Sequence, residues 1–208
     1  MPPLPEQPDF KQALRDTARS DGPLGALRAF HRQAGPRTLV CGPASHALAP
    51  TELVAPTPDG ERTYMPTLLA GMGLAIVRTS SSGQGADDAV LWLRLGLAER
   101  LMDAVLDHLG TRSFGETPLL RQPVLKDALA EVAVGLLRTE SGLLDAPGPG
   151  LDDTALSVLH QQLDTAEHAL LKLLGGTGLT TRGPGADAYV SGVLADLYAP
   201  SALPQETA

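Results

Sequence analysis

Long aliphatic repeats, separated by glycine and proline, are the feature that most restricts how this chain can fold. From residue 86 to residue 198, leucine, valine and alanine recur every three or four residues in four segments. This spacing places apolar side chains along one face of an α-helix. The segments end at Gly110, at Ser141-Gly142, at Gly175-Gly176 and before Pro200. Four helices joined by short connections predict an antiparallel bundle.

The first of these four helices carries apolar residues on more than one face. Leu91 and Leu95 begin one apolar series, and Leu93 and Leu97 widen it. We therefore expect this helix to be the most buried. Three neighbouring helices do not easily cover both faces, so we also expect a homodimer or homotetramer.

Residues 1–85 differ in composition from the rest of the chain, because they contain most of the prolines and only short apolar segments. The small-residue stretch Ser80–Gly85 is typical of a linker. We therefore divide the chain into an N-terminal segment, 1–85, and a helical bundle domain, 86–208. In the first we expect two short helices, at 8–18 and 24–34, a buried stretch at 68–77, and a small sheet from segments 38–41, 52–55 and 63–65.

Charge and cysteine content exclude several classes of function. The net charge is −8 and the basic residues form no run, which argues against binding to nucleic acid or to an anionic membrane surface. Cys41 is the only cysteine, so neither an intrachain disulfide nor a thiolate-rich metal site can form. The N-terminus lacks the pattern of a secretory signal, and the longest apolar stretch is too short to cross a membrane. We expect a cytoplasmic protein.

Short motifs at the predicted helix ends resemble the C-terminal helical domain of the acyl-CoA dehydrogenases over residues 86–198. They are Arg112-Ser113-Phe114-Gly115, Pro118-Leu119, Gln122 and Gly175-Gly176-Thr177-Gly178-Leu179. The resemblance implies a mainly α fold, with a four-helix bundle that mediates dimers and tetramers. It also implies that FAD, where bound, is contacted by Arg112, Ser113, Phe114, Gln122, Gly175 and Gly176.

Several residues of this chain depart from the pattern of the family, and these departures bear on the chemistry that we expect of the chain. The position of the usual catalytic glutamate is occupied by Ala199, and the alternative position falls near Ala86. Asp87 and Asp88 beside it are the candidate bases, since a desolvated carboxylate abstracts protons efficiently. The same two residues also suit the start of a helix. Residues 1–85 are too few for the N-terminal helical domain and β-barrel of a full family member.

Two functions follow from the resemblance and its departures. The first is an enzyme acting on a small acyl or polyketide-type substrate. It would depend on a flavin if a partner completes the site, or otherwise be repurposed for non-redox chemistry such as cyclisation or elimination. The alternative is a non-catalytic subunit that stabilises or completes the active site of a fuller homologue.

Each candidate residue also has a structural interpretation. Arg112 would cap a helix, Phe114 would pack between helices and Gln122 would be solvated. His160, Asp164 and His168 recur at four-residue steps with Glu167 beside them. This spacing suits either a divalent metal or the solvent-exposed face of a helix, and the exposed face is the more common case.

Overall fold

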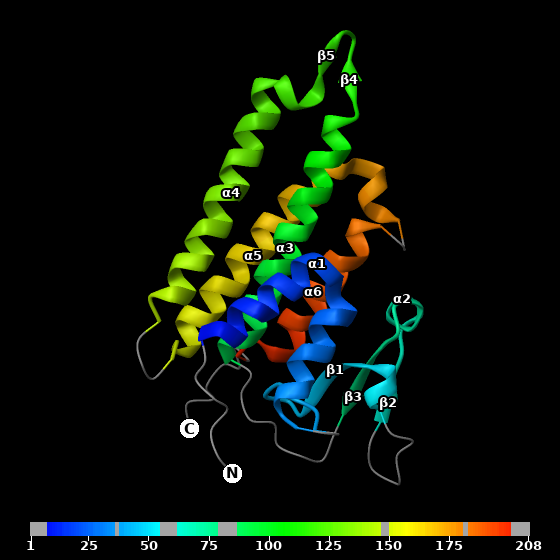
Figure 1. Cartoon of the computed structure of the whole chain (residues 1–208), viewed down its shortest axis with the longest axis vertical. Helices are drawn as coiled ribbons and strands as arrows, with labels where there is room; N and C mark the ends of the chain where they lie inside the picture. Colours follow the sequence, from blue (N-terminus) through cyan, green and yellow to red (C-terminus); the bar gives the residue numbers. More distant parts are fainter. Residues whose placement is uncertain are drawn as a thin grey trace, which may run out of the picture.

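The computed structural model describes residues 8–35, 38–54, 62–78, 87–146, 150–180 and 183–200. These residues form a mainly helical structure with a small antiparallel sheet (Figure 1). In chain order the elements are α1 (Pro8–Gln33), β1 (His46–Pro50), the short helix η1 (Thr51–Leu53), β2 (Arg62–Tyr64), α2 (Thr67–Gly71), β3 (Leu74–Arg78), α3 (Asp87–Gly110), β4 (Ser113–Phe114), β5 (Thr117–Pro118), η2 (Leu119–Arg121), α4 (Pro123–Leu144), α5 (Asp153–Leu174), η3 (Gly175–Leu179) and α6 (Pro184–Tyr198).

The four predicted helices of the second half are present, and their ends follow local signals. Pro123 begins α4, where its missing N–H and fixed φ suit the first turn. Asp152 caps α5 by accepting a hydrogen bond from the backbone N–H of Ala155 at 2.7 Å. Gly175, with φ at 56°, ends α5 in a conformation that glycine adopts without strain.

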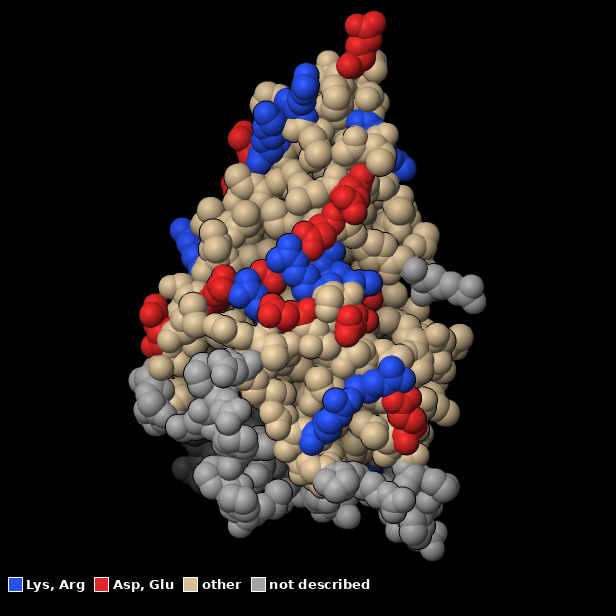
Figure 2. Space-filling model, in the orientation of Figure 1, with Lys and Arg blue, Asp and Glu red and all other residues tan. Residues whose placement is uncertain are grey.

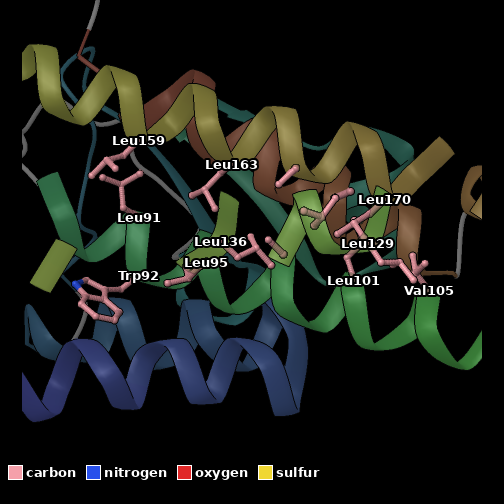
Figure 3. Close-up of a cluster of buried hydrophobic side chains, with 14 of the residues drawn as sticks. Leu91, Trp92, Leu95, Leu101, Val105, Leu129, Leu136, Leu159, Leu163 and Leu170 are labelled. Atoms are coloured by element: carbon pink, nitrogen blue, oxygen red, sulfur yellow. The ribbon is translucent and has the colours of Figure 1, made fainter. Parts of the chain in front are cut away.

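Helix α3 lies at the centre and is buried on two faces. One face packs against α4 and α5, where Leu95 and Leu101 meet Leu136 and Leu163 in one apolar cluster (Figure 3). The opposite face, including Leu93, belongs to a second cluster with residues of α1, the sheet and α6. The prediction that α3 is the most buried helix is confirmed. Both of its apolar faces are covered within the chain.

Two helical segments, as predicted, make up α1, and they meet at a kink. Gly22 has a positive φ of 75° and Pro23 follows it. Because Pro23 has no N–H, the carbonyl of Arg19 loses its helical partner. The Arg100 side chain from α3 donates to the carbonyls of Arg19 and Ser20 at 3.0 and 2.9 Å, so α3 satisfies the groups that the kink leaves open.

Ion pairs join α1 to the helices beside it. Arg15 binds both Glu99 of α3 and Glu140 of α4, and Arg19 binds Asp103 of α3. Figure 2 shows basic and acidic side chains mixed in a band across the middle of the molecule. The hydrogen bonds of the two carboxylates hold the pKa of Arg15 above its usual value, although burial opposes the rise.

The sheet has the order β1-β3-β2, with both pairs antiparallel. The predicted segment 63–65 lies mostly in β2, but the predictions for 38–41 and 52–55 are wrong. Residues 38–41 form no strand, and 52–53 belong to η1, with residue 55 outside the described part. The other two strands are 46–50 and 74–78. Ala47, Leu48 and Ala49 are all buried, so β1 lacks the alternation that marks a half-exposed strand.

Residues on both sides of the predicted domain boundary share one core. The linker itself, 80–85, lies outside the described residues. Leu14 and Leu27 of α1 nevertheless belong to the same apolar cluster as Leu97 of α3 and Val190 of α6. Leu69 and Leu74, in the stretch predicted to be buried, belong to it too. Among the described helices, we find none that is both long and apolar enough to span a membrane.

Candidate functional site

The residues predicted to contact a cofactor lie at one end of the molecule, around the α3–α4 connection (Figure 1). Arg112 follows α3, and Ser113 and Phe114 form strand β4 of a two-stranded hairpin. Phe114 is 79% exposed, so the expectation that it packs between helices is wrong. Gln122 precedes the first turn of α4, where its side chain makes no capping hydrogen bond.

Three of these six residues share a surface depression of about 470 Å³, which we call the η3 depression. Arg112, Gly175 and Gly176 line it together with His108 and Lys172, among others. Ser113, Phe114 and Gln122 are not part of its lining. The basic side chains of Arg112 and Lys172 and an exposed glycine backbone suit an anionic group such as a phosphate or carboxylate.

The two predicted bases lie at the start of α3. The helix begins at Asp87, whose side chain lies outside the described residues. Asp88 accepts a hydrogen bond from the Lys11 ammonium at 2.5 Å, which ties α3 to α1. Asp88 is therefore held in an ion pair between helices, and it lines neither the η3 depression nor the cleft described below.

A fully buried arginine on α3 organises a polar cluster that sequence reasoning missed. The Arg94 guanidinium donates from Nε to Ser191 Oγ at 2.9 Å and from Nη1 to His160 Nδ1 at 2.7 Å. Its Nη2 donates to Asp164 Oδ1 at 2.5 Å and, over a longer 3.4 Å, to Glu167 Oε2. Helix α5 thus supplies an imidazole and two carboxyl groups, and α6 supplies a hydroxyl.

His160 is held neutral in this cluster. Arginine has no acceptor, so Nδ1 of the imidazole must accept the hydrogen bond from Arg94 and the ring proton must sit on Nε2. Burial, and then the positive charge of Arg94, lower the pKa of His160 to about 4. Its Nε2 has no hydrogen-bond partner among the described residues.

Glu167 is the carboxyl group that this arrangement pairs less completely. Asp164 makes the short contact with Arg94, whereas Glu167 makes only the 3.4 Å one, and its Oε1 has no partner in the described part of the chain. The residue is 4% exposed. Burial raises the pKa of Glu167 to about 7, although Arg94 and Ser191 oppose the rise. Near neutral pH this carboxyl can therefore both take up and release a proton.

Asp164 and Glu167 line an open cleft of about 430 Å³ along α5 and α6, the α5–α6 cleft. Its apolar walls include Leu171 of α5 and Val193 of α6. Several of the residues that line it are glycine or alanine; the full lining is Leu68, Asp164, Glu167, His168, Leu171, Gly178, Thr180, Gly185, Ala186, Ala188, Tyr189, Gly192, Val193 and Asp196. A mostly apolar cleft with a buried titratable carboxyl has the character of a small-molecule site.

The cluster differs from both interpretations of the α5 sequence pattern. His160 and Glu167 are buried, so they do not belong to a solvent-exposed face. His168 is exposed and its Nδ1 lies 2.7 Å from the Asp164 carbonyl oxygen. Within the described ranges, no group of three or more histidine, cysteine or acidic residues is arranged to hold a metal. The available signal was Arg94, a charge inside an otherwise apolar run.

Neither a known protein-family model nor a curated protein matches this sequence.

Proposed function

We propose that this chain is an acid–base enzyme that acts on a small acyl or polyketide-type substrate in the α5–α6 cleft. In this proposal it is a divergent relative of the acyl-CoA dehydrogenases that carries out non-redox chemistry such as cyclisation or elimination. The observation that carries the proposal is Glu167, a buried residue that lines an open, largely apolar cleft and has one carboxyl oxygen without a partner among the described residues. We assign the proton transfer to Glu167 rather than to Asp88, because Asp88 is engaged by Lys11. The side chain of the other candidate, Asp87, lies outside the described residues.

The proposed chemistry uses the two protonation states of one group. Ionised Glu167 would remove a proton from the carbon next to the acyl carbonyl. In an elimination, the bond between the β-carbon and its leaving group breaks as the carbon–carbon double bond forms, and the carboxylic acid returns the proton to the leaving group. In a cyclisation, the α-carbon adds to a second carbonyl of the same substrate, and the acid returns the proton to the oxygen of that carbonyl. Arg94 lies close enough to favour the carboxylate, while burial favours the acid. A pKa near the working pH lets one group perform both steps. The apolar walls would hold the carbon chain of the substrate and keep water from it.

FAD belongs to a second form of the proposal, in which a partner subunit completes the site. Arg112 and Lys172 beside the exposed Gly175-Gly176 backbone fit a phosphate group in the η3 depression. Ser113, Phe114 and Gln122 do not line it, so these residues fit only part of such a cofactor. Flavin, when bound, would supply hydride transfer, which Glu167 does not supply.

The alternative function is that of a non-catalytic subunit that completes the site of a fuller homologue. Phe114 favours this possibility, because an aromatic side chain 79% exposed at the end of a hairpin is available to a partner.

Proton exchange at the acyl α-carbon tests the enzyme proposal. The wild-type protein is incubated in D₂O with a neutral short-chain acyl thioester, and deuterium uptake is followed by mass spectrometry. We expect exchange faster than in buffer, with Glu167→Gln slowing it by about 100-fold or more. Glu116→Gln, the same change at an exposed hairpin residue, should leave the rate unchanged. Wild-type exchange at the buffer rate, or full exchange in Glu167→Gln, would exclude Glu167 as the proton-transfer group.

A further inference from the structure

Helix α4 lies at the edge of the molecule (Figure 1), and side chains on its outer face, Val124 and Val134 among them, are exposed. Between this face and α5 runs a groove of about 510 Å³. Its lining is mostly small, apolar or uncharged; in full it is Ala128, Glu131, Val132, Gly135, Arg138, Val158, Gln161, Gln162, Thr165, Ala166 and Ala169. Among the described residues of this lining, Glu131 and Arg138 are the only charged ones.

Apolar side chains beside the groove are exposed. Val134 of α4 is 46% exposed, and Val124 and Val158 are also open to solvent. Next to Val134, a Cβ built on Gly135 meets nothing within 4 Å, so the helix has a notch at this point. Val134 and Gly135 point about 100° apart, so they lie on opposite sides of the line along α4 that joins Glu131 and Arg138.

The two charged residues are unpaired and stand seven residues apart on this face. Neither Glu131 nor Arg138 takes part in an ion pair among the described residues, although many other charged residues do. Two helical turns separate them by about 10 Å along the axis, too far for a direct contact within one helix. They therefore offer one negative and one positive partner to a neighbouring molecule.

We propose that this face binds the same face of a second copy of the chain, with the two α4 helices antiparallel. A twofold axis passing between Val134 and Gly135 places Glu131 of each copy opposite Arg138 of the other. It also brings the two Val134 side chains together on one side of the axis and the two Gly135 notches together on the other side. This arrangement is self-complementary, as a twofold interface requires. The charges favour a second copy over an unrelated partner, because a single helix carries both halves of the ion pair.

The location of this interface could not be deduced from α3. The sequence suggested association because α3 has two apolar faces, but α1, the sheet and α6 cover the second of them. The exposed valines of α4 supply the apolar contact instead. This proposal does not depend on the chemistry of the α5–α6 cleft, so the two can fail separately.

A charge-swap experiment tests the interface. Sedimentation equilibrium is measured on the full chain at concentrations from about 1 to 100 µM for the wild type, for Glu131→Arg, for Arg138→Glu and for the double variant. We expect a wild-type dimer. Each single variant places like charges opposite each other twice, and should raise the dimer dissociation constant about tenfold or more. The double variant restores both pairs and should return it to within about threefold of the wild-type value.

Two controls separate the interface from folding. Both charged residues are exposed, so circular dichroism and thermal melting should be unchanged in all variants. Glu116→Arg, an equal change of charge on the exposed hairpin, should leave the dissociation constant unchanged. A monomer at every concentration would overturn the proposal, and so would a dimer that the single variants do not weaken or that the double variant does not restore.

Discussion

At the scale of single residues, the α5–α6 cleft depends on how one buried cation is shared. Arg94 has enough donors for its neighbours, but Asp164 takes the short contact and Glu167 the long one. Removing a carboxyl group from water without full pairing disfavours its charged form. The result is one carboxyl tied to Arg94 and one whose pKa is raised to about 7.

The raised pKa of Glu167 predicts a pH-dependent stability. A carboxyl whose pKa is raised on folding contributes stability that is fully present below about pH 4.5 and is lost as the pH rises through about 7. His160, whose pKa is lowered to about 4, contributes stability that is present above about pH 6.5 and is lost as the pH falls through 4. The two effects have opposite signs between pH 4.5 and 6.5.

Comparison of the wild type with Glu167→Gln isolates the contribution of the Glu167 carboxyl to the free energy of unfolding. The amide has no charge at any pH, so the variant should gain stability relative to the wild type between pH 5 and pH 8, by up to about 3 kcal/mol. Urea unfolding at pH 5, 6, 7 and 8 measures the difference. His160 is present in both proteins and its effect should largely cancel. Parallel stability curves for the two proteins would contradict the raised pKa.

At the scale of elements, the fold depends on how closely α1 approaches α3. Gly96 of α3 faces the backbone of α1, where an added Cβ would lie 2.2 Å from the Arg15 carbonyl oxygen and 2.8 Å from Ala18 Cβ. The ion pairs of Arg15 and Arg19 with α3 flank this contact. The absence of a side chain at Gly96 therefore allows the two helices to come together at this point.

Alanine substitutions at two helical glycines test that contact. Gly96→Ala must separate α1 from α3 and should lower the free energy of unfolding by about 1–3 kcal/mol or more. Gly192 of α6 has nothing within 4 Å of the corresponding Cβ, so Gly192→Ala should raise it by up to about 1 kcal/mol through helix propensity. Chemical denaturation of both variants provides the comparison. Equal stability of Gly96→Ala and the wild type would show that the helices do not need this close approach.

At the scale of the whole molecule, the N-terminal residues complete the core of the helices that follow. Tyr198 at the end of α6 illustrates the connection. Its hydroxyl accepts a hydrogen bond from the backbone N–H of Leu48 at 3.2 Å and donates one to the carbonyl of Val40 at 2.9 Å. Burial raises the pKa of this hydroxyl above its usual value. The last helix is thereby held to β1 and to the segment before it.

A fragment comprising residues 87–208 should therefore not fold like the full chain. Without α1 and the sheet, it would expose Leu93, Leu97 and Val190, which are fully or almost fully buried in the full chain. We expect the fragment to bind a hydrophobic dye and to melt without a cooperative transition. Calorimetry of the fragment and of the full chain makes the comparison. A cooperative transition in a monomeric fragment would support an independent bundle domain and contradict this expectation.

The sequence by itself determined where the long helices lie and which of their faces are apolar. These properties depend on residues three or four positions apart and on local end signals such as Pro123, Asp152 and Gly175, so they can be recognised without a partner. The strands of the sheet were harder, because β1 is buried on all but its first residue and shows no alternation.

Only the tertiary structure decided where the cleft and its titratable group lie. Arg94 and His160 are 66 positions apart in the chain, and His160, Asp164 and Glu167 have the spacing of an ordinary polar helix face. Whether such a face meets water or a buried arginine depends on how α3, α5 and α6 pack. Packing also covered the second apolar face of α3, and it left the outer face of α4, with its exposed valines, open to solvent. Burial of a charge is a property of its surroundings, and for Glu167 those surroundings come from three separate helices.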